Sequence, residues 1–190
     1  MSEVSRTPVT QKCYIGLDLS LSSTGFCLKT GSEIRVETIK SKPDDTPNDL
    51  ARLKYITAEI MRRIPKSVSM ICVEDFFVPS SMQMAGAAIK LAMLGTAVRL
   101  ALYDAGMPFF VISPNQLKKW ITSSGASQKS LIVMAVYKAY GLECKDDNQA
   151  DSSVLAHIGE ALDCPKAEYP KYQLEVLGKV RSERPRYNVV

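Results

Sequence analysis

Short apolar runs separated by turn residues occupy the first forty positions of the chain. Residues 13–19 form an apolar run rich in β-forming residues, which Asp18 interrupts. Residues 25–29 and 33–39 have the pattern of two further strands, joined by a hairpin turn at Thr30-Gly31-Ser32. Because short connections join neighbouring antiparallel strands, the chain is expected to open with three antiparallel strands.

After this opening, helical and strand patterns alternate. Asn48 is placed to cap a helix over residues 49–64, in which leucine and isoleucine recur at helical spacing until Pro65. The other expected elements are strands at 70–73 and 109–112 and helices at 83–104, 114–120, 128–140 and 148–162. The order β-β-β-α-β-α-β-α-α-α predicts an α/β fold with a mixed five-stranded sheet and helices on both faces.

The length of 190 residues suits one domain, which we expect over residues 1–165. Residues 166–190 are basic and contain two prolines and a glycine, so we expect a tail that is partly ordered at best. No apolar run comes close to the roughly 20 residues that cross a bilayer, and residues 1–12 lack the apolar segment of a signal peptide. These features predict a cytoplasmic protein without membrane contact.

The basic residues are unevenly distributed. The formal net charge of +4 is compatible with a nucleic-acid ligand. Between residues 113 and 145, Glu143 is the single acid among five lysines, namely Lys118, Lys119, Lys129, Lys138 and Lys145. Acidic residues lie just outside this stretch, and a basic rim around an acidic centre suits a polyanion held over a cation site.

The cysteines and the histidine give little sign of metal or disulfide chemistry. Five cysteines form no CxxC pair, and His157 is the only histidine. An odd count without close pairs argues against a disulfide framework, and a structural zinc site needs four closely spaced Cys or His ligands. Three of the cysteines, Cys13, Cys27 and Cys72, are expected to be buried in strands.

Acidic residues in three segments stand where the apolar pattern should exclude charge. Asp18 interrupts the first strand, Glu74 ends the most hydrophobic strand, and Asp147 and Asp151 lie one helical turn apart at the start of the last predicted helix. Carboxylates that converge repel each other unless a cation neutralises them, and hard oxygen ligands suit Mg²⁺ or Mn²⁺. Two such ions clamp the attacking and leaving oxygens in phosphodiester hydrolysis.

Each acid also has a simpler explanation. An aspartate at a strand end often forms a turn or caps a helix, and acids in a first helical turn favour the helix dipole. Asp146 and Asp163 are assigned to this simpler class. The metal-site interpretation therefore depends on the three segments meeting on one sheet.

Four segments carry a resemblance to a known family. They are GLDLSLSSTGF, VEDFF, LKKWITSSGASQKS and DDNQADSSVLAHIG. In this order and at these separations they resemble the RuvC family of Holliday junction resolvases, especially its bacteriophage members, over roughly residues 13–159. The resemblance implies an RNase H-like fold. It also implies a metal-dependent endonuclease that cuts four-way junctions and other branched DNA by paired nicks, as a homodimer.

The resemblance also implies roles for the acids. Asp18 and Glu74 match the first and second catalytic acids, and Asp151 with its partner Asp147 matches those of the last helix. All four are expected to bind Mg²⁺, with Mn²⁺ as a substitute and two ions per site. Cellular members place two acids, or a histidine and an acid, three residues apart, whereas Asn148 stands three residues before Asp151 here. The fourth ligand is therefore either Asp147 or Asn148.

DNA-contacting residues follow from the same resemblance. Lys118 and Lys129 match lysines that hold the scissile phosphate and stabilise its developing charge, so Lys129 is also expected to act in catalysis. Lys119 is a neighbouring candidate for DNA binding. Phe77 matches an aromatic residue that stacks on unpaired bases at the junction, whereas Phe76 is expected in the core. The helix over residues 83–104, rich in methionine and small residues, is suited equally to a dimer seam or to the core.

Other functions are compatible with parts of this pattern. An ATP-binding domain of the actin, Hsp70 and sugar-kinase class shares the three-strand opening, although such proteins need two domains and about twice this length. A non-catalytic branched-DNA-binding module would fit the unusual last helix, and a nuclease of the same fold acting on RNA would fit the acids.

Overall fold

A mixed five-stranded sheet forms the centre of the protein. The computed structural model describes residues 11–76, 85–126, 129–166, 168–183 and 187. The strands are β1 (Cys13–Asp18), β2 (Ser23–Thr30), β3 (Glu33–Lys40), β4 (Met70–Glu74) and β5 (Phe109–Ile112), in the spatial order β3-β2-β1-β4-β5. β1, β2 and β3 pair antiparallel, whereas β4 pairs parallel to β1 and β5. The predicted sheet is confirmed.

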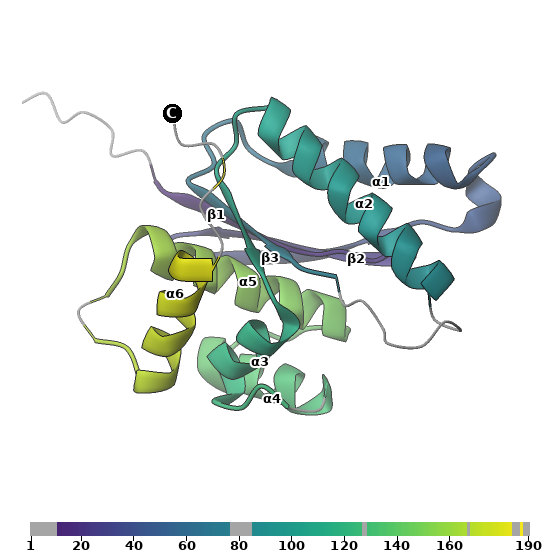
Figure 1. Cartoon of the computed structure of the whole chain (residues 1–190). Coiled ribbons are helices and arrows are strands. Elements are labelled where there is room, and N and C mark those ends of the chain that lie inside the picture. Colours follow the sequence, from purple (N-terminus) through teal and green to yellow (C-terminus); the bar gives the residue numbers. More distant parts are fainter. Residues whose placement is uncertain (1–10, 77–84, 127–128, 167, 184–186, 188–190) are drawn as a thin grey trace, which may run out of the picture.

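Helices cover both faces of this sheet (Figure 1). One face carries α1 (Asp49–Arg63) and α2 (Ala85–Asp104), and a short 3-10 helix, η1 (Pro43–Asp45), precedes α1. The other face carries α3 (Pro114–Thr122), α4 (Lys129–Tyr140), α5 (Asp147–Asp163) and α6 (Lys171–Glu183). The elements expected from the sequence are all present, with ends that differ by at most two residues within the described part of the chain.

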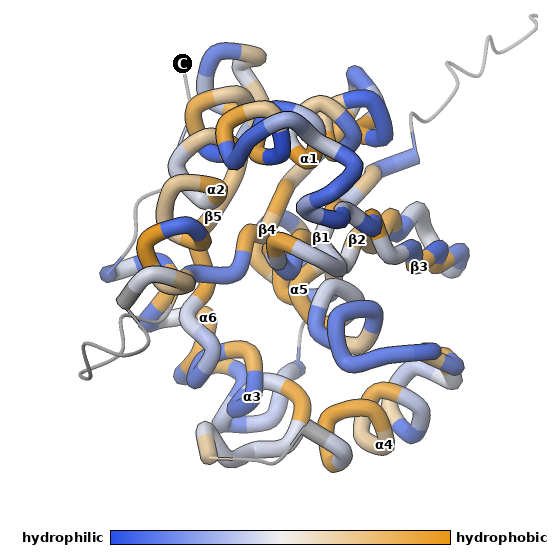
Figure 2. Tube along the Cα trace, turned by 90° about the vertical axis from the view of Figure 1, so that its right-hand side faces the viewer, coloured by the Kyte–Doolittle hydropathy of each residue, from blue (hydrophilic) through white to orange (hydrophobic). Residues whose placement is uncertain are grey.

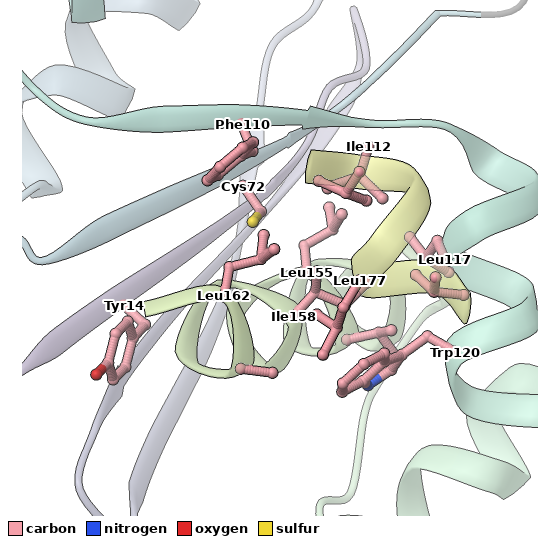
Figure 3. Packing of buried hydrophobic residues seen from close by; sticks show 14 of the residues in the cluster. Tyr14, Cys72, Phe110, Ile112, Leu117, Trp120, Leu155, Ile158, Leu162 and Leu177 are labelled. Carbon is pink, nitrogen blue, oxygen red and sulfur yellow. The ribbon is translucent and has the colours of Figure 1, made fainter. Parts of the chain in front are cut away.

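Alternation along the strands divides the apolar residues between two cores. Ile15, Leu17 and Val73 belong to the core under α1 and α2. Tyr14 and Cys72 belong to the core formed with α3 to α6, in which Figure 3 shows Cys72 near side chains of α5. Figure 2 shows hydrophobic residues along β4 and β5 and polar ones interspersed along β3, the edge strand. Since successive side chains point to opposite faces, the even-numbered positions of β1 and β4 point towards α5.

α5 packs unusually close to the sheet because glycine faces it. A Cβ atom on Gly16 would lie 1.9 Å from the carbonyl oxygen of Ser152 and 2.7 Å from the backbone nitrogen of Ala156. A Cβ atom on Gly25 would lie 2.1 Å from the carbonyl oxygen of Asn148. Any side chain at either strand position would therefore push α5 outwards, and the two glycines fix the distance between its first turns and β1 and β2.

Part of the tail expected after Pro165 folds as α6, a helix that the sequence pattern did not predict. Val176, Leu177 and Val180 of this helix are buried in the core with α3 and α5. Pro170 precedes the first turn, where a proline is tolerated and its carbonyl oxygen accepts a hydrogen bond from the backbone N–H of Leu174 at 3.1 Å. The prolines and basic residues thus masked a short helical pattern of apolar residues.

The chain end also returns to the sheet. Tyr187 exchanges two backbone hydrogen bonds with Phe109 on β5, and the two rings stack with centroids 4.7 Å apart. Residues beyond position 165 therefore extend the same fold, and the sequence boundary at 165 does not separate a free tail from it.

The expectation that no apolar run is long enough to cross a bilayer is wrong for α2. Residues 86–104 of α2 are long and apolar enough to do so by length and composition. In this fold Leu94, Val98 and Leu102 of the helix are fully buried against the sheet. Lys90 and Arg99 of the same helix form ion pairs with Asp49 and Asp75.

Replacing Gly16 with alanine tests the close packing of α5. The new Cβ atom would meet backbone atoms that cannot move alone, so we expect Gly16→Ala to lower the free energy of unfolding by roughly 3 kcal/mol or more. Gly178→Ala is the matched control, because no atom lies within 4 Å of its would-be Cβ and α6 gains up to about 1 kcal/mol in helix propensity. Urea unfolding measures both, and equal effects of the two changes would contradict this packing.

Candidate active site

A cavity of about 360 Å³ opens where β1 and β4 end. The side chains around it come from the ends of both strands, from α2, α3 and α4, and from the first two turns of α5. They are Asp18, Leu19, Ser20, Glu74, Asp75, Phe76, Leu91, Gly95, Pro114, Lys118, Ile132, Asn148 and Asp151. β1 and β4 are parallel neighbours with Leu17 opposite Val73, so Asp18 and Glu74 leave the sheet side by side. The meeting of these segments is as predicted.

Asp18 is the buried centre of this group, with only 7% of its surface exposed. Burial raises the pKa of Asp18 well above its ordinary value. A side-chain hydrogen bond with Glu74 and the negative charges of Glu74, Asp151 and Asp147 raise it further. The hydrogen bond between two carboxyl groups requires a shared proton, since two nearby carboxylates resist ionising together. All four predicted acids therefore interact electrostatically.

The first turn of α5 holds its acids in place through a network with β3. Asp146 caps the helix, because its Oδ1 accepts a hydrogen bond from the backbone N–H of Gln149 at 2.8 Å. The Thr38 hydroxyl donates to the other oxygen of Asp146 at 2.9 Å and accepts from the Gln149 side-chain amide at 3.1 Å. Asp146 thus has the structural role predicted for it, and the residue after it begins the helix.

Asp163 also has its predicted structural role, at the other end of α5. Its carboxylate accepts hydrogen bonds from Lys12 Nζ at 3.0 Å and from the Tyr14 hydroxyl at 3.2 Å. The acids of α5 therefore have different roles: Asp151 lines the cavity, whereas Asp163 ties the far end of the helix to β1.

The charges of Glu74, Asp147 and Asp151 act on Asp18, but the four carboxylates are not arranged around one ion-sized position. Within the described residues, no three acidic, histidine or cysteine side chains are arranged as a ready ligand set for one metal ion. Asn148 and Asp151 line the cavity, whereas Asp147 is identified through its effect on the pKa of Asp18. Carboxylate and amide oxygens that gather at one cavity are hard donors of the kind that divalent cations bind.

The predicted DNA-binding residues separate in the structure. Lys118 on α3 lines the cavity. Lys119 forms an ion pair at 2.5 Å with Glu175 of α6 and borders a different hollow. Lys129 is the first residue of α4, but its side chain lies outside the described part, as does Phe77 altogether. The structure therefore places Lys118 at the cavity of the acids, whereas Lys119 lies against Glu175 of α6.

Several cavity residues were missed or misjudged at the sequence level. Phe76, expected in the core, is half-buried and forms part of the cavity wall beside Asp75. Leu91 and Gly95 come from α2 and carry no chemical signal in the sequence. The position of Phe76 after two acids at the end of a buried strand was the one available indication that it leaves the sheet.

The turn after β1 is closed by its own side chains. The backbone N–H of Ser20 donates to the Thr24 hydroxyl at 3.1 Å, and that hydroxyl donates to the Ser20 carbonyl oxygen at 2.7 Å. The N–H groups of Ser22 and Ser23 reach the Ser20 hydroxyl at 3.4 Å. Three N–H groups of this turn are thus occupied within it, unlike those of a phosphate-binding loop, which face the ligand.

Solved structures share this fold. A Thermus thermophilus RuvC structure aligns with a TM-score of 0.60 at 21% identity, covering 76% of this chain and 90% of that one. A second structure, described as T. thermophilus RuvC in complex with Holliday junction substrate, aligns with the same TM-score and coverage at 22% identity.

Sequence comparison identifies the family. Two curated relatives bear the name crossover junction endodeoxyribonuclease RuvC. The one from Rhodopirellula baltica is 26% identical over 84% of this chain and 92% of its own length. The one from Acinetobacter baylyi is 28% identical over 77% of this chain and 81% of its own length. The sequence profile described as crossover junction endodeoxyribonuclease RuvC matches residues 14–158, which include all four acids. The chain belongs to the RuvC family of crossover junction endodeoxyribonucleases.

Proposed function

We propose that this chain is a structure-selective endonuclease that resolves four-way DNA junctions by paired, metal-dependent nicks. One observation carries the proposal: carboxylates from β1, β4 and α5 meet at a cavity that Lys118 also lines. The names of the curated relatives and the solved complex of a related fold with a Holliday junction support it. Other branched DNA, such as forks and flaps, is a secondary substrate class in this proposal.

Asp18, Glu74 and Asp151 would hold the divalent ions, with either Asp147 or Asn148 as the fourth ligand. Enzymes of this family depend on divalent metal, and the oxygen donors here fit Mg²⁺, with Mn²⁺ as a substitute and two ions per site. The raised pKa of Asp18 supports this fit, because it reports gathered negative charge that a cation would offset. When bound, two such ions activate a water molecule and neutralise charge on the phosphodiester.

Cationic and aromatic side chains supply the remaining contacts. Lys118 lines the same cavity as the acids, and its ammonium group would hold the scissile phosphate and favour charge developing on it. Lys129 is proposed for the same role, which includes a part in catalysis, and Phe77 for stacking on bases exposed at the branch point. Lys119 would contribute to DNA binding only by leaving Glu175.

We also propose a homodimer built on α2. Ile89, Met93, Leu100 and Tyr103 form an outward-facing stripe at helical spacing, and each is between 42% and 58% exposed. Beside the stripe lies an apolar groove of about 320 Å³ that Leu50 helps to line. A two-fold axis through the middle of the stripe would place each end of the stripe against the opposite end of the partner's stripe. The groove of each protomer would then be buried. Two active sites then face the two strands that a junction resolvase must cut.

The competing functions fit less well. The occupied N–H groups of the turn after β1 and the family match both argue against an ATP-binding domain. A purely binding module would not need a buried Asp18 whose pKa is raised by burial and by three neighbouring acids. The RNA-directed nuclease remains distinguishable by assay, since it would prefer an RNA hybrid to a four-way DNA junction. Like its family, the protein is expected to act on DNA in the cytoplasm, of a host cell if it is phage-encoded.

Asp18→Asn is expected to abolish cleavage and spare junction binding. The change removes one metal ligand while the lysines that contact phosphate remain. The rate of nicking of a labelled four-way junction should fall by roughly 10³-fold or more, because loss of metal-based stabilisation costs several kcal/mol. Gel-shift affinity without divalent metal should match the wild type. Asp44→Asn, an exposed acid of η1, is the control, and nicking by Asp18→Asn at the control's rate would remove Asp18 from the site.

The same variant should alter the pH dependence of stability in metal-free buffer. The pKa of Asp18 in the folded protein is raised above its unfolded value near 4, so the folded state binds the proton more tightly. This contribution to stability is complete below about pH 4 and is lost as pH rises through the folded pKa. Asp18→Asn lacks that loss, so its melting temperature should exceed that of the wild type by on the order of a few degrees at pH 8 and converge towards it near pH 4. Parallel curves would contradict the raised pKa.

A further inference from the structure

The end of β4 places two successive acids on opposite faces of the sheet. The backbone N–H of Asp75 donates to the carbonyl oxygen of Ile112 at 2.7 Å, which extends the pairing with β5 past Glu74. Glu74 then points towards Asp18 and α5, and Asp75 towards α2, because side chains alternate along a strand. A contact that holds the Asp75 side chain in place therefore also holds the backbone that orients Glu74.

Arg99 of α2 makes that fixing contact. Its Nη2 lies 2.8 Å from Asp75 Oδ1, and both side chains are mostly buried, at 24% and 17% exposure. Charge-assisted hydrogen bonds of this kind are about twice as strong as neutral ones. The guanidinium carbon also lies 5.4 Å from the centre of the Phe76 ring, within the range of a cation–π interaction. One arginine thus holds both residues that follow Glu74.

α2 is shaped to receive this strand end. Gly95 stands one turn before Arg99, and a Cβ atom there would lie 3.4 Å from the Phe76 ring, an ordinary contact distance, so this turn of α2 lies directly beside the ring. Leu91, Gly95 and Arg99 recur every four residues along one face of α2, separate from the outward stripe proposed for the dimer. The helix, which crosses the sheet in Figure 1, therefore reaches the cavity wall on one face and the proposed partner on another.

We propose that Arg99 is a positioning residue for Glu74, and that through it α2 holds the metal site in shape. Its guanidinium also neutralises Asp75, which lines the same cavity as Asp18 and Glu74. Without that cation, Asp75 would add its charge to the four coupled carboxylates, and the end of β4 would lose its anchor. This inference rests on the proposed function, since it concerns metal binding at that site.

Mn²⁺ binding by the full-length metal-free protein tests the role of Arg99. Arg99→Gln is expected to weaken Mn²⁺ binding, measured by calorimetry, about ten-fold or more, as loss of an outer-shell partner typically does. The Mn²⁺ affinity of Arg99→Lys should fall between those of the wild type and Arg99→Gln, because lysine keeps the positive charge but not the planar guanidinium. The single-turnover nicking rate should drop and recover in part at high Mn²⁺, whereas metal-free junction affinity and the sedimentation coefficient stay unchanged.

Two control variants separate positioning from general loosening. Arg62→Gln breaks an exposed ion pair with Glu59 on α1 and should leave Mn²⁺ affinity unchanged. Val98→Ala removes buried packing from the same turn of α2 and should lower the melting temperature without changing Mn²⁺ affinity. The inference is overturned if Arg99→Gln binds Mn²⁺ like Arg62→Gln, or if Val98→Ala weakens binding as much as Arg99→Gln. Wild-type protein that neither binds Mn²⁺ nor nicks a junction would instead refute the proposed function.

Discussion

The close contact of α5 with β1 and β2 is the constraint on which the rest of the structure depends. Gly16 and Gly25 let the backbone of α5 approach the sheet to a distance that any Cβ atom would prevent. That approach brings the acids of the first turns of α5 within electrostatic reach of Asp18, although their sequence positions are more than 120 residues apart. The parallel pairing of β1 and β4 adds Glu74 at the same edge. The site is thus a product of backbone packing, with few of its contacts made locally.

The acids of the site are held in place by neighbouring residues that are not themselves proposed to bind metal or DNA. Thr38 and Gln149 fix the start of α5 on one side, and α2 supports the end of β4 through Arg99 on the other. A buried carboxyl group such as Asp18, beside three other acids that raise its pKa, is unfavourable for folding without a cation, so the surrounding packing must offset that cost. Such local conflicts with folding rules are expected at functional sites, where binding a cation relieves them.

Much of this fold was predictable because its signals are local. The strands and most helices follow from apolar periodicity, and the acids stood out because Asp18 and Glu74 break apolar runs. α6 was missed because its apolar residues are few and lie among prolines and charges, and its packing against α3, α5 and β5 is not visible in the sequence. The division between Lys118 and Lys119, adjacent in sequence, depends on Glu175 in that same helix. Arg99 gave no signal in the sequence, because its contact with Asp75 forms only when α2 packs against the end of β4.

The central claim is that side chains distant in sequence bind divalent metal at one place. A crystal of the protein soaked in Mn²⁺ and measured for anomalous scattering tests it most directly. We expect anomalous peaks between Asp18, Glu74 and Asp151, with either Asp147 or Asn148 completing the ligands. An ordered crystal with no peak at this cavity, or with Mn²⁺ bound only elsewhere on the chain, would contradict the account.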